Sequence, residues 1–230
     1  MEIPLYDTLE GQVALVTGAT RGIGKRIADG LVEHGATVYA GARDTEDITG
    51  DDRHALELDV TVETQRVAAI DRIEADVGRL DILVNNAGVM DSREPLATMP
   101  TETIDRTLTT NLRGPIHLTK HALDLLLARP GGRVVNVSSG LGAITEAQSG
   151  GMPAYRISKT GLNGLTRYLD GEYDRLLANS VCPGYVQTDM TDGSAPRTPQ
   201  KGAETPIWLA RFRPSGPGGE FWRDKSPKAW

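Results

Sequence analysis

The sequence predicts a doubly wound α/β fold, in which helices cover both faces of a parallel sheet of about seven strands. Strand-like and helix-like segments alternate along the chain, an order typical of parallel sheets. Several strand-like segments, such as Val13-Ala14-Leu15-Val16, are apolar on both faces, as strands are when a sheet is covered on both sides. The chain has 230 residues, which suits one domain, 1–230, and we expect no internal boundary.

The expected strands are short apolar or β-branched runs bounded by turn residues. In chain order they lie at 13–17, 37–40, 54–58, 82–84, 133–137, 179–181 and 219–222. The expected helices carry apolar residues at helical spacing, as Ile23, Ile27 and Leu31 do in the first of them, which Gly35 ends. They lie at 22–34, 62–77, 101–129, 154–173 and 198–211, with an interruption of the third near Gly114-Pro115.

Composition and charge exclude several classes of protein. The net charge is −6 and no basic stripe stands out, so we expect no nucleic-acid partner. No run approaches the roughly 18 apolar residues that span a bilayer, and no secretory signal begins the chain, so we expect no membrane association. The one cysteine, Cys182, allows no intrachain disulfide; we expect a buried strand thiol and a cytoplasmic protein. His117 and His121 share a helix face without an evident third ligand, so no metal site is expected.

A glycine-rich turn lies between the first strand and the first helix, in Thr17-Gly18-Ala19-Thr20-Arg21-Gly22-Ile23-Gly24. Glycines let the backbone approach a pyrophosphate closely, and a helix N-terminus presents free N–H groups to an anion. The alternative is an ordinary tight turn. We predict a dinucleotide site that includes Gly18, Thr20, Arg21, Gly22, Ile23 and Gly24.

The end of the second strand bears on which dinucleotide binds. An acidic residue there binds a ribose 2′-hydroxyl, whereas a basic residue accommodates a 2′-phosphate. Here Arg43 comes first and Asp44 follows, and Arg21 sits in the glycine-rich turn. Two guanidinium groups would clamp a phosphate, so we favour NADP(H) over NAD(H). A small shift in register would instead place Asp44 at this position.

Tyr155 and Lys159 are four residues apart on a predicted helix and therefore share a face. A nearby cation favours the phenolate, so we expect the pKa of Tyr155 to fall from about 10 towards neutrality. Such a phenol can give a proton to a carbonyl oxygen or take one from an alcohol. Taken alone the pair is weak evidence, because Tyr and Lys at this spacing are common.

The motifs Thr-Gly-x-x-x-Gly-x-Gly, Asn-Asn-Ala-Gly, Ser-Ser and Tyr-x-x-x-Lys occur in that order. Together they resemble the classical short-chain dehydrogenase/reductase family over nearly the whole chain, which implies a Rossmann domain. The resemblance implies that Tyr155 is the catalytic acid/base and that Lys159 lowers its pKa and holds the nicotinamide ribose. It further implies that Ser139 hydrogen-bonds the substrate oxygen and that Asn111 belongs to the proton-relay tetrad.

The same resemblance implies three further cofactor segments, which contact the adenine, line the ribose side and flank the nicotinamide. In chain order these residues are Asp59, Val60, Asn86, Ala87, Gly88, Pro183, Gly184, Val186 and Thr188. Val186 would contact the nicotinamide carboxamide through its backbone, and Thr188 through its hydroxyl.

The catalytic serine has a competitor in Ser138. The family spacing Ser-x-x-Gly fits Ser139 through Gly142, so we choose Ser139. Tyr155 follows Ser139 by 16 residues, a slightly longer gap than in compact members of the family. We expect the additional residues, 146–152, to reshape one wall of a substrate pocket formed by about 140–200.

Pro115 suggests a route for protons. Proline has no N–H to bond the carbonyl four residues earlier, and that carbonyl belongs to Asn111. If the helix continues here, the carbonyl is free to bind a water that passes protons towards Lys159.

The C-terminal third, including Gly219-Glu220-Phe221-Trp222 and Trp230, is similar to carbonyl reductase-like members of the family. We therefore expect a reductase that uses NADP(H) to convert a ketone or aldehyde to an alcohol, or the reverse. The alternatives are an NAD(H)-dependent alcohol dehydrogenase of the same family and a non-catalytic dinucleotide-binding regulator. By analogy with the family, helices 101–129 and 154–173 would form the face of a homodimer or homotetramer.

Overall fold

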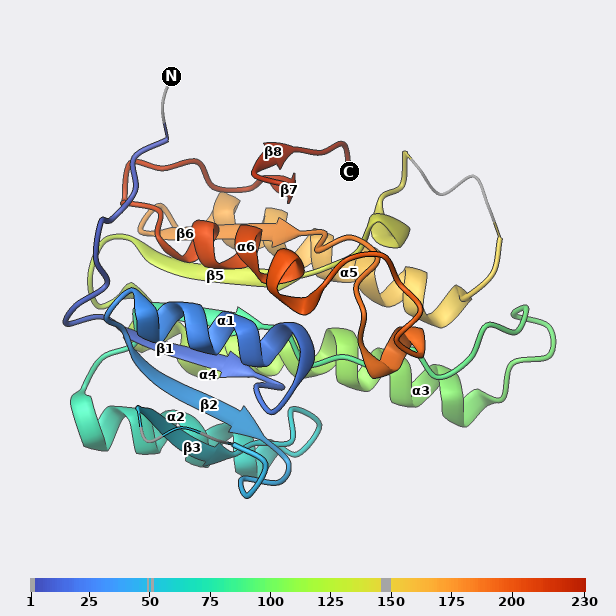
Figure 1. The fold of residues 1–230 in the computed structure, drawn as a ribbon, viewed down its shortest axis with the longest axis horizontal. Helices are drawn as coiled ribbons and strands as arrows, with labels where there is room; N and C mark the ends of the chain where they lie inside the picture. The colour runs from blue at the N-terminus through green and yellow to red at the C-terminus, as the bar shows by residue number, and fades with distance from the viewer. Residues whose placement is uncertain (1–2, 49, 51, 146–149) are drawn as a thin grey trace.

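The computed structural model describes residues 3–48, 50, 52–145 and 150–230, whose strands form one sheet in the order β3-β2-β1-β4-β5-β6-β7-β8 (Figure 1). The strands are β1 (Val13–Thr17), β2 (Thr37–Ala42), β3 (Arg53–Glu57), β4 (Ile82–Asn85), β5 (Gly132–Val137), β6 (Leu176–Val181), β7 (Phe221–Arg223) and β8 (Ser226–Pro227). The α-helices are α1 (Gly22–Glu33), α2 (Glu63–Val77), α3 (Thr101–Leu108), α4 (Gly114–Leu127), α5 (Pro153–Glu172) and α6 (Pro199–Ala210). Three short helices complete the set: η1 (Thr109–Arg113), η2 (Gly140–Gly142) and η3 (Asp189–Thr191).

The middle of the sheet is apolar on both faces, as predicted. Every residue of β1, β4 and β5 is buried, and these strands pair in parallel. The strand order reverses between β1 and β4, because β2 and β3 lie on one side and β5 to β7 on the other. In such sheets a crevice opens at the carboxyl ends of the two strands that flank the reversal, and ligands bind there.

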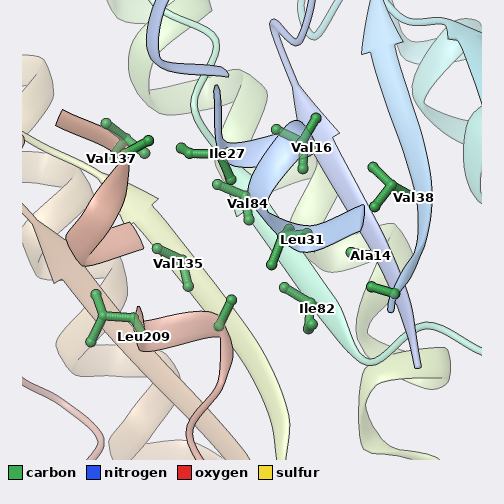
Figure 2. Packing of buried hydrophobic residues seen from close by; sticks show 14 of the residues in the cluster. Ala14, Val16, Ile27, Leu31, Val38, Ile82, Val84, Val135, Val137 and Leu209 are labelled. Carbon is green, nitrogen blue, oxygen red and sulfur yellow. The ribbon is translucent and has the colours of Figure 1, made fainter. Parts of the chain in front are cut away.

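Two hydrophobic cores flank the sheet and confirm the doubly wound prediction. On one face Ile27 and Leu31 of α1 and Leu209 of α6 pack against Val16, Val84 and other strand residues (Figure 2). The other core buries the following residues of α2, α4 and α5: Ala69, Ile70, Ile73, Leu118, Ala122, Leu126 and Leu169. Apolar residues at helical spacing therefore face the sheet from both sides, and the buried strands of the sheet's middle are covered.

The predicted break near Gly114-Pro115 is a change of helical pitch rather than an end. The chain runs from α3 through one π-helical turn, η1, directly into α4. In that turn the Gly114 N–H reaches the Thr109 carbonyl, five residues back. Pro115 cannot donate a hydrogen bond, and a local π turn lets the helix continue past a residue that lacks an N–H.

The eighth strand, β8, was not predicted. It pairs antiparallel with β7 through a tight turn whose residues Asp224 and Lys225 have φ of 51° and 60°. Two-residue turns of this type normally carry Asn-Gly or Asp-Gly, and Lys225 here takes the place of the glycine, so the sequence lacked the usual turn signal. A second expectation, that residues 146–152 reshape the pocket wall, falls partly on 146–149, which lie outside the described residues.

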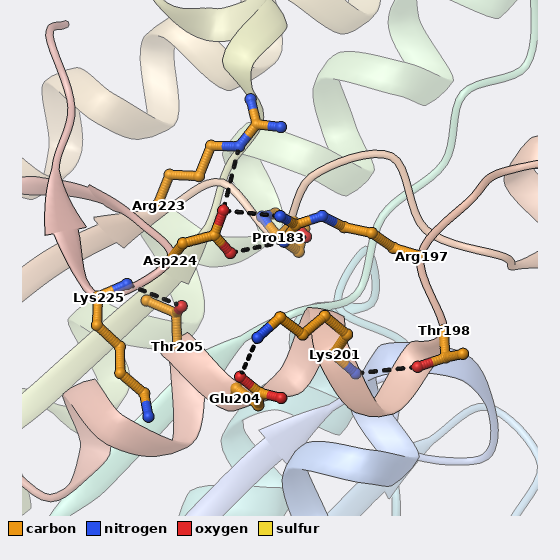
Figure 3. A network of polar contacts seen from close by, with 9 residues as sticks. All are labelled: Pro183, Arg197, Thr198, Lys201, Glu204, Thr205, Arg223, Asp224 and Lys225. Atoms are coloured by element: carbon orange, nitrogen blue, oxygen red, sulfur yellow. Dashed lines mark hydrogen bonds and ion pairs between the residues drawn. The ribbon is translucent and has the colours of Figure 1, made fainter.

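The β7–β8 hairpin is held to the segment that follows β6. Arg197 donates two hydrogen bonds of 2.7 Å to the Asp224 carboxylate and contacts the Pro183 carbonyl at 3.4 Å (Figure 3). The Arg197 guanidinium lowers the pKa of Asp224. The N–H of Lys225, in the hairpin turn, donates to Oγ1 of Thr205 on α6 at 3.3 Å. The C-terminal hairpin and the segment after β6 are therefore held to each other by side-chain hydrogen bonds.

Candidate active site

A cavity of about 980 Å³ lies at the carboxyl ends of the parallel strands, at the reversal between β1 and β4. All but one of the predicted site residues line it. These are Gly18, Thr20, Arg21, Gly22, Ile23, Gly24, Arg43, Asp59, Val60, Asn86, Ala87, Gly88, Ser139, Tyr155, Lys159, Pro183, Gly184, Val186 and Thr188. The exception is Asn111, which is fully buried behind the cavity wall.

The glycine-rich turn forms a cradle that side chains would fill. A Cβ atom at Gly24 would lie 2.1 Å from the Gly18 carbonyl oxygen and 2.4 Å from Asn86 Nδ2. Gly18 and Gly22 have φ of 66° and 56°, which favour glycine. No side chain among the described residues caps the N-terminus of α1, so its first N–H groups are available. This donor set and this space fit the pyrophosphate of a dinucleotide.

Asn86 ties the end of β4 to that cradle. Its Nδ2 donates to the Thr17 carbonyl at 2.9 Å and to the Gly18 carbonyl at 3.2 Å. In return Thr17 Oγ1 accepts the N–H groups of Asn86 and Ala87, each at 3.0 Å. The Asn-Asn-Ala-Gly segment thus holds the glycine-rich turn in place from the adjacent strand.

Arg43 and Asp44 both line the cavity where β2 ends. The Asp44 carboxylate accepts the Glu46 N–H at 3.0 Å, so it caps its own turn. Arg43 makes no ion pair within the described part of the chain. Arg21 also lines the cavity and forms an exposed ion pair with Asp189 of η3 at 2.9 Å, so its sharing of a phosphate with Arg43 stays a prediction. Of the two guanidinium groups, that of Arg21 has an ion-pair partner and that of Arg43 has none among the described residues.

Tyr155 and Lys159 lie on one face of α5, as the i, i+4 spacing requires. Lys159 Nζ is 5.7 Å from the centre of the Tyr155 ring and donates to the Val137 carbonyl at 2.8 Å. Val137 is the last residue of β5, so α5 and the sheet fix the ammonium group together. Only 4% of Lys159 is exposed.

The expected lowering of the Tyr155 pKa is not found in the protein alone. Burial raises the pKa of Tyr155 to about 12, although a side-chain hydrogen bond with Ser139 acts in the opposite direction. Burial also lowers the pKa of Lys159 to about 8. The sequence showed a cation near a phenol, but it could not show that both groups lose most of their contact with water. At neutral pH the phenol is fully protonated, which is the form that donates a proton.

The two serines at the end of β5 have different partners. Ser138 is buried, and its hydroxyl donates to the Lys159 carbonyl at 3.2 Å. Ser139 hydrogen-bonds Tyr155 and also accepts the Leu141 N–H at 3.2 Å, which caps η2. Both serines line the cavity, and the choice of Ser139 as the catalytic serine stays a prediction.

Asn111 connects the site to the π turn. Its side-chain amide exchanges two 2.8 Å hydrogen bonds with the backbone of Val89 and donates to Ser158 Oγ at 3.1 Å. Ser158 in turn donates to the Tyr155 carbonyl at 2.7 Å. The Asn111 side chain is therefore linked through Ser158 to the first turn of α5, which carries Tyr155. The water at the Asn111 carbonyl stays a prediction.

Lys159 is expected to give the protein a recognisable dependence of stability on pH. The folded state releases the Lys159 proton at about pH 8, whereas an unfolded lysine releases it near its usual 10.5. Between these values the unfolded state binds more protons, so the free energy of unfolding from Lys159 rises with pH. Tyr155 acts in the opposite sense only above its usual value of 10, because its folded pKa is about 12.

Urea unfolding at several pH values between 8 and 10 measures this slope. We expect the rise in wild type and its loss in Lys159→Met. The matched variant Lys120→Met, at an exposed position of α4, should keep it. An identical slope in Lys159→Met and wild type would contradict the assignment of the slope to Lys159.

Several cavity residues were not among the individually predicted site residues, although all of them except Met90 lie within the predicted pocket region 140–200. They include Met90, Met152, Met190, Leu141 and Tyr185. Met152 has φ of 53°, a conformation that costs a non-glycine residue about 1–2 kcal/mol. Met90 lies close in sequence to the predicted Gly88, and that closeness was the only available signal for it. The predicted pocket at about 140–200 is therefore incomplete, because Met90 and its neighbours in the β4–α3 segment also line the cavity.

The β4–α3 segment also brings charge to the cavity. Asp91 and Arg106 form an ion pair with distances of 2.5 and 2.7 Å, and Arg93 lies beside them in the lining. Within the described ranges, no group of three or more His, Cys, Asp or Glu side chains could hold a metal ion. Over the same ranges, no helix is long and apolar enough to cross a membrane.

Comparisons with known proteins give matches over most of the chain. The family model described as short chain dehydrogenase matches residues 12–198. The chain is 38% identical over 192 residues to a 3-oxoacyl-(acyl-carrier-protein) reductase of Vibrio cholerae serotype O1, covering 80% of this chain and 77% of that protein. The carbonyl reductase Sniffer of D. melanogaster superposes with a TM-score of 0.85 at 27% identity, covering 96% of this chain and all of that one. A gluconate 5-dehydrogenase from Burkholderia cenocepacia J2315, solved with NADP and tartrate, gives a TM-score of 0.84 at 26% identity and covers 94% of each chain.

Proposed function

The chain belongs to the short-chain dehydrogenase family, and we propose that within it this protein is a reductase that converts a ketone or aldehyde to an alcohol with NADPH, or runs the reverse reaction. The observation that carries the proposal is the arrangement of Tyr155, Ser139 and Lys159 around one cavity that also contains the glycine cradle. A panel of ketones and aldehydes with NADPH, followed by the loss of NADPH absorbance, tests it. A protein that binds NADPH but oxidises it with none of these compounds would instead be a dinucleotide-binding regulator.

The chain's own residues would handle the substrate oxygen and its proton. Ser139 hydrogen-bonds the carbonyl oxygen and orients it towards Tyr155. The Tyr155 hydroxyl donates its proton to that oxygen as negative charge develops on it. Lys159 supplies positive charge beside the phenolate that remains and holds the ribose hydroxyls. Asn111 keeps the catalytic turn of α5 in register and offers its carbonyl to a proton-carrying water.

The residues of the cavity would hold the dinucleotide along its length. The glycine cradle and the N-terminus of α1 take the pyrophosphate, Asp59 and Val60 the adenine, and Val186 and Thr188 the nicotinamide carboxamide. When bound, the reduced nicotinamide supplies the hydride that reaches the carbonyl carbon. Arg66 supports the adenine side, since it donates to the Val60 carbonyl at 2.7 Å while itself buried.

The preference for NADP(H) is assigned to Arg43. Its guanidinium lines the cavity at the end of β2 and makes no ion pair within the described residues, so it can meet a 2′-phosphate. A charge-assisted hydrogen bond of this kind is worth about 1.5–3 kcal/mol, or roughly tenfold to a hundredfold in affinity. We therefore expect Arg43→Ala to raise KM for NADPH by that factor and to leave KM for NADH nearly unchanged.

Steady-state kinetics with both coenzymes in wild type and variant measure this. Arg72→Ala, on the exposed side of α2, removes the same charge away from the cavity and should preserve the ratio of the two KM values. Equal losses for NADPH and NADH in Arg43→Ala would refute the assignment.

One observation favours the second candidate, an NAD(H)-dependent alcohol dehydrogenase: Asp44 lies beside Arg43 in the same lining. Wild type with a lower KM for NADH would establish it.

The substrate is expected to have an apolar body. Met90, Met152, Met190 and Leu141 line the cavity, and methionine side chains adapt to ligands of different shape. We therefore expect broad use of apolar ketones rather than strict selection of one compound. The cytoplasm stays the expected location. Association through the helical region 101–129, which contains α3, η1 and α4, and through α5 stays an expectation by analogy.

A further inference from the structure

We propose that Trp230 is a positioning residue for the catalytic serine, because the C-terminal segment 226–230 holds the loop that carries Ser139. This inference rests on the proposed reductase function. In Figure 1 the end of the chain lies beside the segment that follows β5, where Ser139 and η2 are located. The two segments are 85 residues apart in sequence at their point of contact, between Thr145 and Trp230.

The first support is a paired hydrogen bond at that contact. The N–H and the Oγ1 hydroxyl of Thr145 donate to the backbone oxygen of Trp230, at 2.8 and 2.6 Å. Thr145 is thus fixed in both backbone and side chain by one residue of the C-terminal segment. It closes the described loop that begins at Ser139.

The second support is an apolar contact beneath the loop. The Trp230 ring stacks on Phe221, with ring centres 5.5 Å apart and planes at 20°. Phe221 is fully buried in a small cluster with Ala143 and Cys182, and Trp230 packs against that cluster. Ala143 belongs to the same loop as Thr145, so Trp230 reaches the loop through both its backbone and its ring.

The remaining contacts lead from this cluster to the serine. Cys182 Sγ accepts the N–H of Gly140, the residue after Ser139, at 3.1 Å. The opposite side of the loop packs closely against α5. A Cβ atom at Gly142 would lie 2.7 Å from the Lys159 carbonyl carbon. The Gly142 carbonyl also accepts from Thr160 Oγ1 at 3.0 Å. The loop is therefore held between the catalytic helix and the C-terminal segment.

This arrangement gives the C-terminal segment a part in setting the distance between Ser139 and Tyr155. The helix fixes Tyr155 and one side of the loop, but the other side has Cys182, Phe221 and Trp230 as its support. Without the Trp230 ring the loop can move away from α5, and the serine hydroxyl moves with it. A displacement of about 1 Å in a positioned group can cost up to a hundredfold in rate.

The experiment compares Trp230→Ala and Trp230→Phe with wild type by steady-state kinetics and NADPH binding. We expect Trp230→Ala to lower kcat by about tenfold or more and to raise KM for the carbonyl substrate. Its Kd for NADPH should stay close to the wild-type value, because the cradle lies on β1 and α1. Trp230→Phe keeps a ring to stack on Phe221 and should recover most of the kcat. Thr145→Val, which removes only the hydroxyl donor, should lower kcat in the same direction by a smaller factor.

Two controls separate positioning from general loss of stability. Tyr168→Ala removes an exposed aromatic side chain from the outer part of α5 and should leave kcat and KM unchanged. Hydrogen exchange of the 140–145 amides should accelerate in Trp230→Ala and not in Tyr168→Ala. Wild-type kcat and KM in Trp230→Ala, or a loss of NADPH affinity equal to the loss of kcat, would overturn the proposal. If wild type reduces no carbonyl compound, the proposed function fails, and the exchange measurement still decides whether Trp230 holds the loop.

Discussion

Tyr155→Phe is expected to lower kcat for carbonyl reduction by about a thousandfold while NADPH binds with nearly wild-type affinity. The change removes one hydroxyl and keeps the ring, so the packing of α5 is preserved. It removes the proton that the substrate oxygen must receive, together with the hydrogen bond to Ser139. Because burial raises the pKa of Tyr155 to about 12, the wild-type phenol carries its proton throughout the neutral range. NADPH oxidation with an active ketone and fluorescence titration of NADPH measure the two effects.

Ser138→Ala is the matched control for a lost hydroxyl beside the cavity. Ser138 also lines the cavity, but its hydroxyl donates to the Lys159 carbonyl. We expect a much smaller loss of kcat there than in Ser139→Ala. Substantial turnover by Tyr155→Phe, with the protein folded and NADPH bound, would mean that another group or water donates the proton.

Patterns within single segments predicted the order of the elements and the place of the site. Val13–Thr17 and Ile82–Asn85 are apolar runs that end in turn residues, and both are buried strands. The motifs after them gather at one edge because the strands are parallel. The residues that follow each strand therefore line one cavity, whatever their separation in sequence.

Features that depend on contacts between distant segments were not predictable in this way. β8 is two residues long and depends on the Arg197–Asp224 pair, which joins residues 27 positions apart. The pairing of Arg21 with Asp189 depends on how η3 approaches the glycine-rich turn. The rise in the Tyr155 pKa depends on burial, which the spacing of Tyr155 and Lys159 does not reveal.

Gly24→Ala is expected to weaken NADPH binding by more than about a hundredfold and to destabilise the fold. The added methyl group would lie 2.1 Å from the Gly18 carbonyl oxygen and 2.4 Å from Asn86 Nδ2. Neither neighbour can move without loss of contacts. Gly18 is part of the backbone of the glycine-rich turn, and Asn86 hydrogen-bonds that backbone. Overpacking of this kind costs about 1–3 kcal/mol of stability. If the same displacement widens the cradle, the pyrophosphate loses its contacts with the Gly18–Gly24 backbone, and binding falls by the larger factor.

Gly164→Ala provides the matched comparison, because it makes the same substitution in α5, where a Cβ atom would meet nothing within 4 Å. Alanine is favoured over glycine inside a helix by about 1 kcal/mol, so this variant should be more stable than wild type and bind NADPH unchanged. Thermal unfolding and NADPH titration of both variants compare the two positions directly. If Gly24→Ala bound NADPH as wild type does, the space at position 24 would not be the determinant of the cradle, and the pyrophosphate would have to lie elsewhere along the α1 N-terminus.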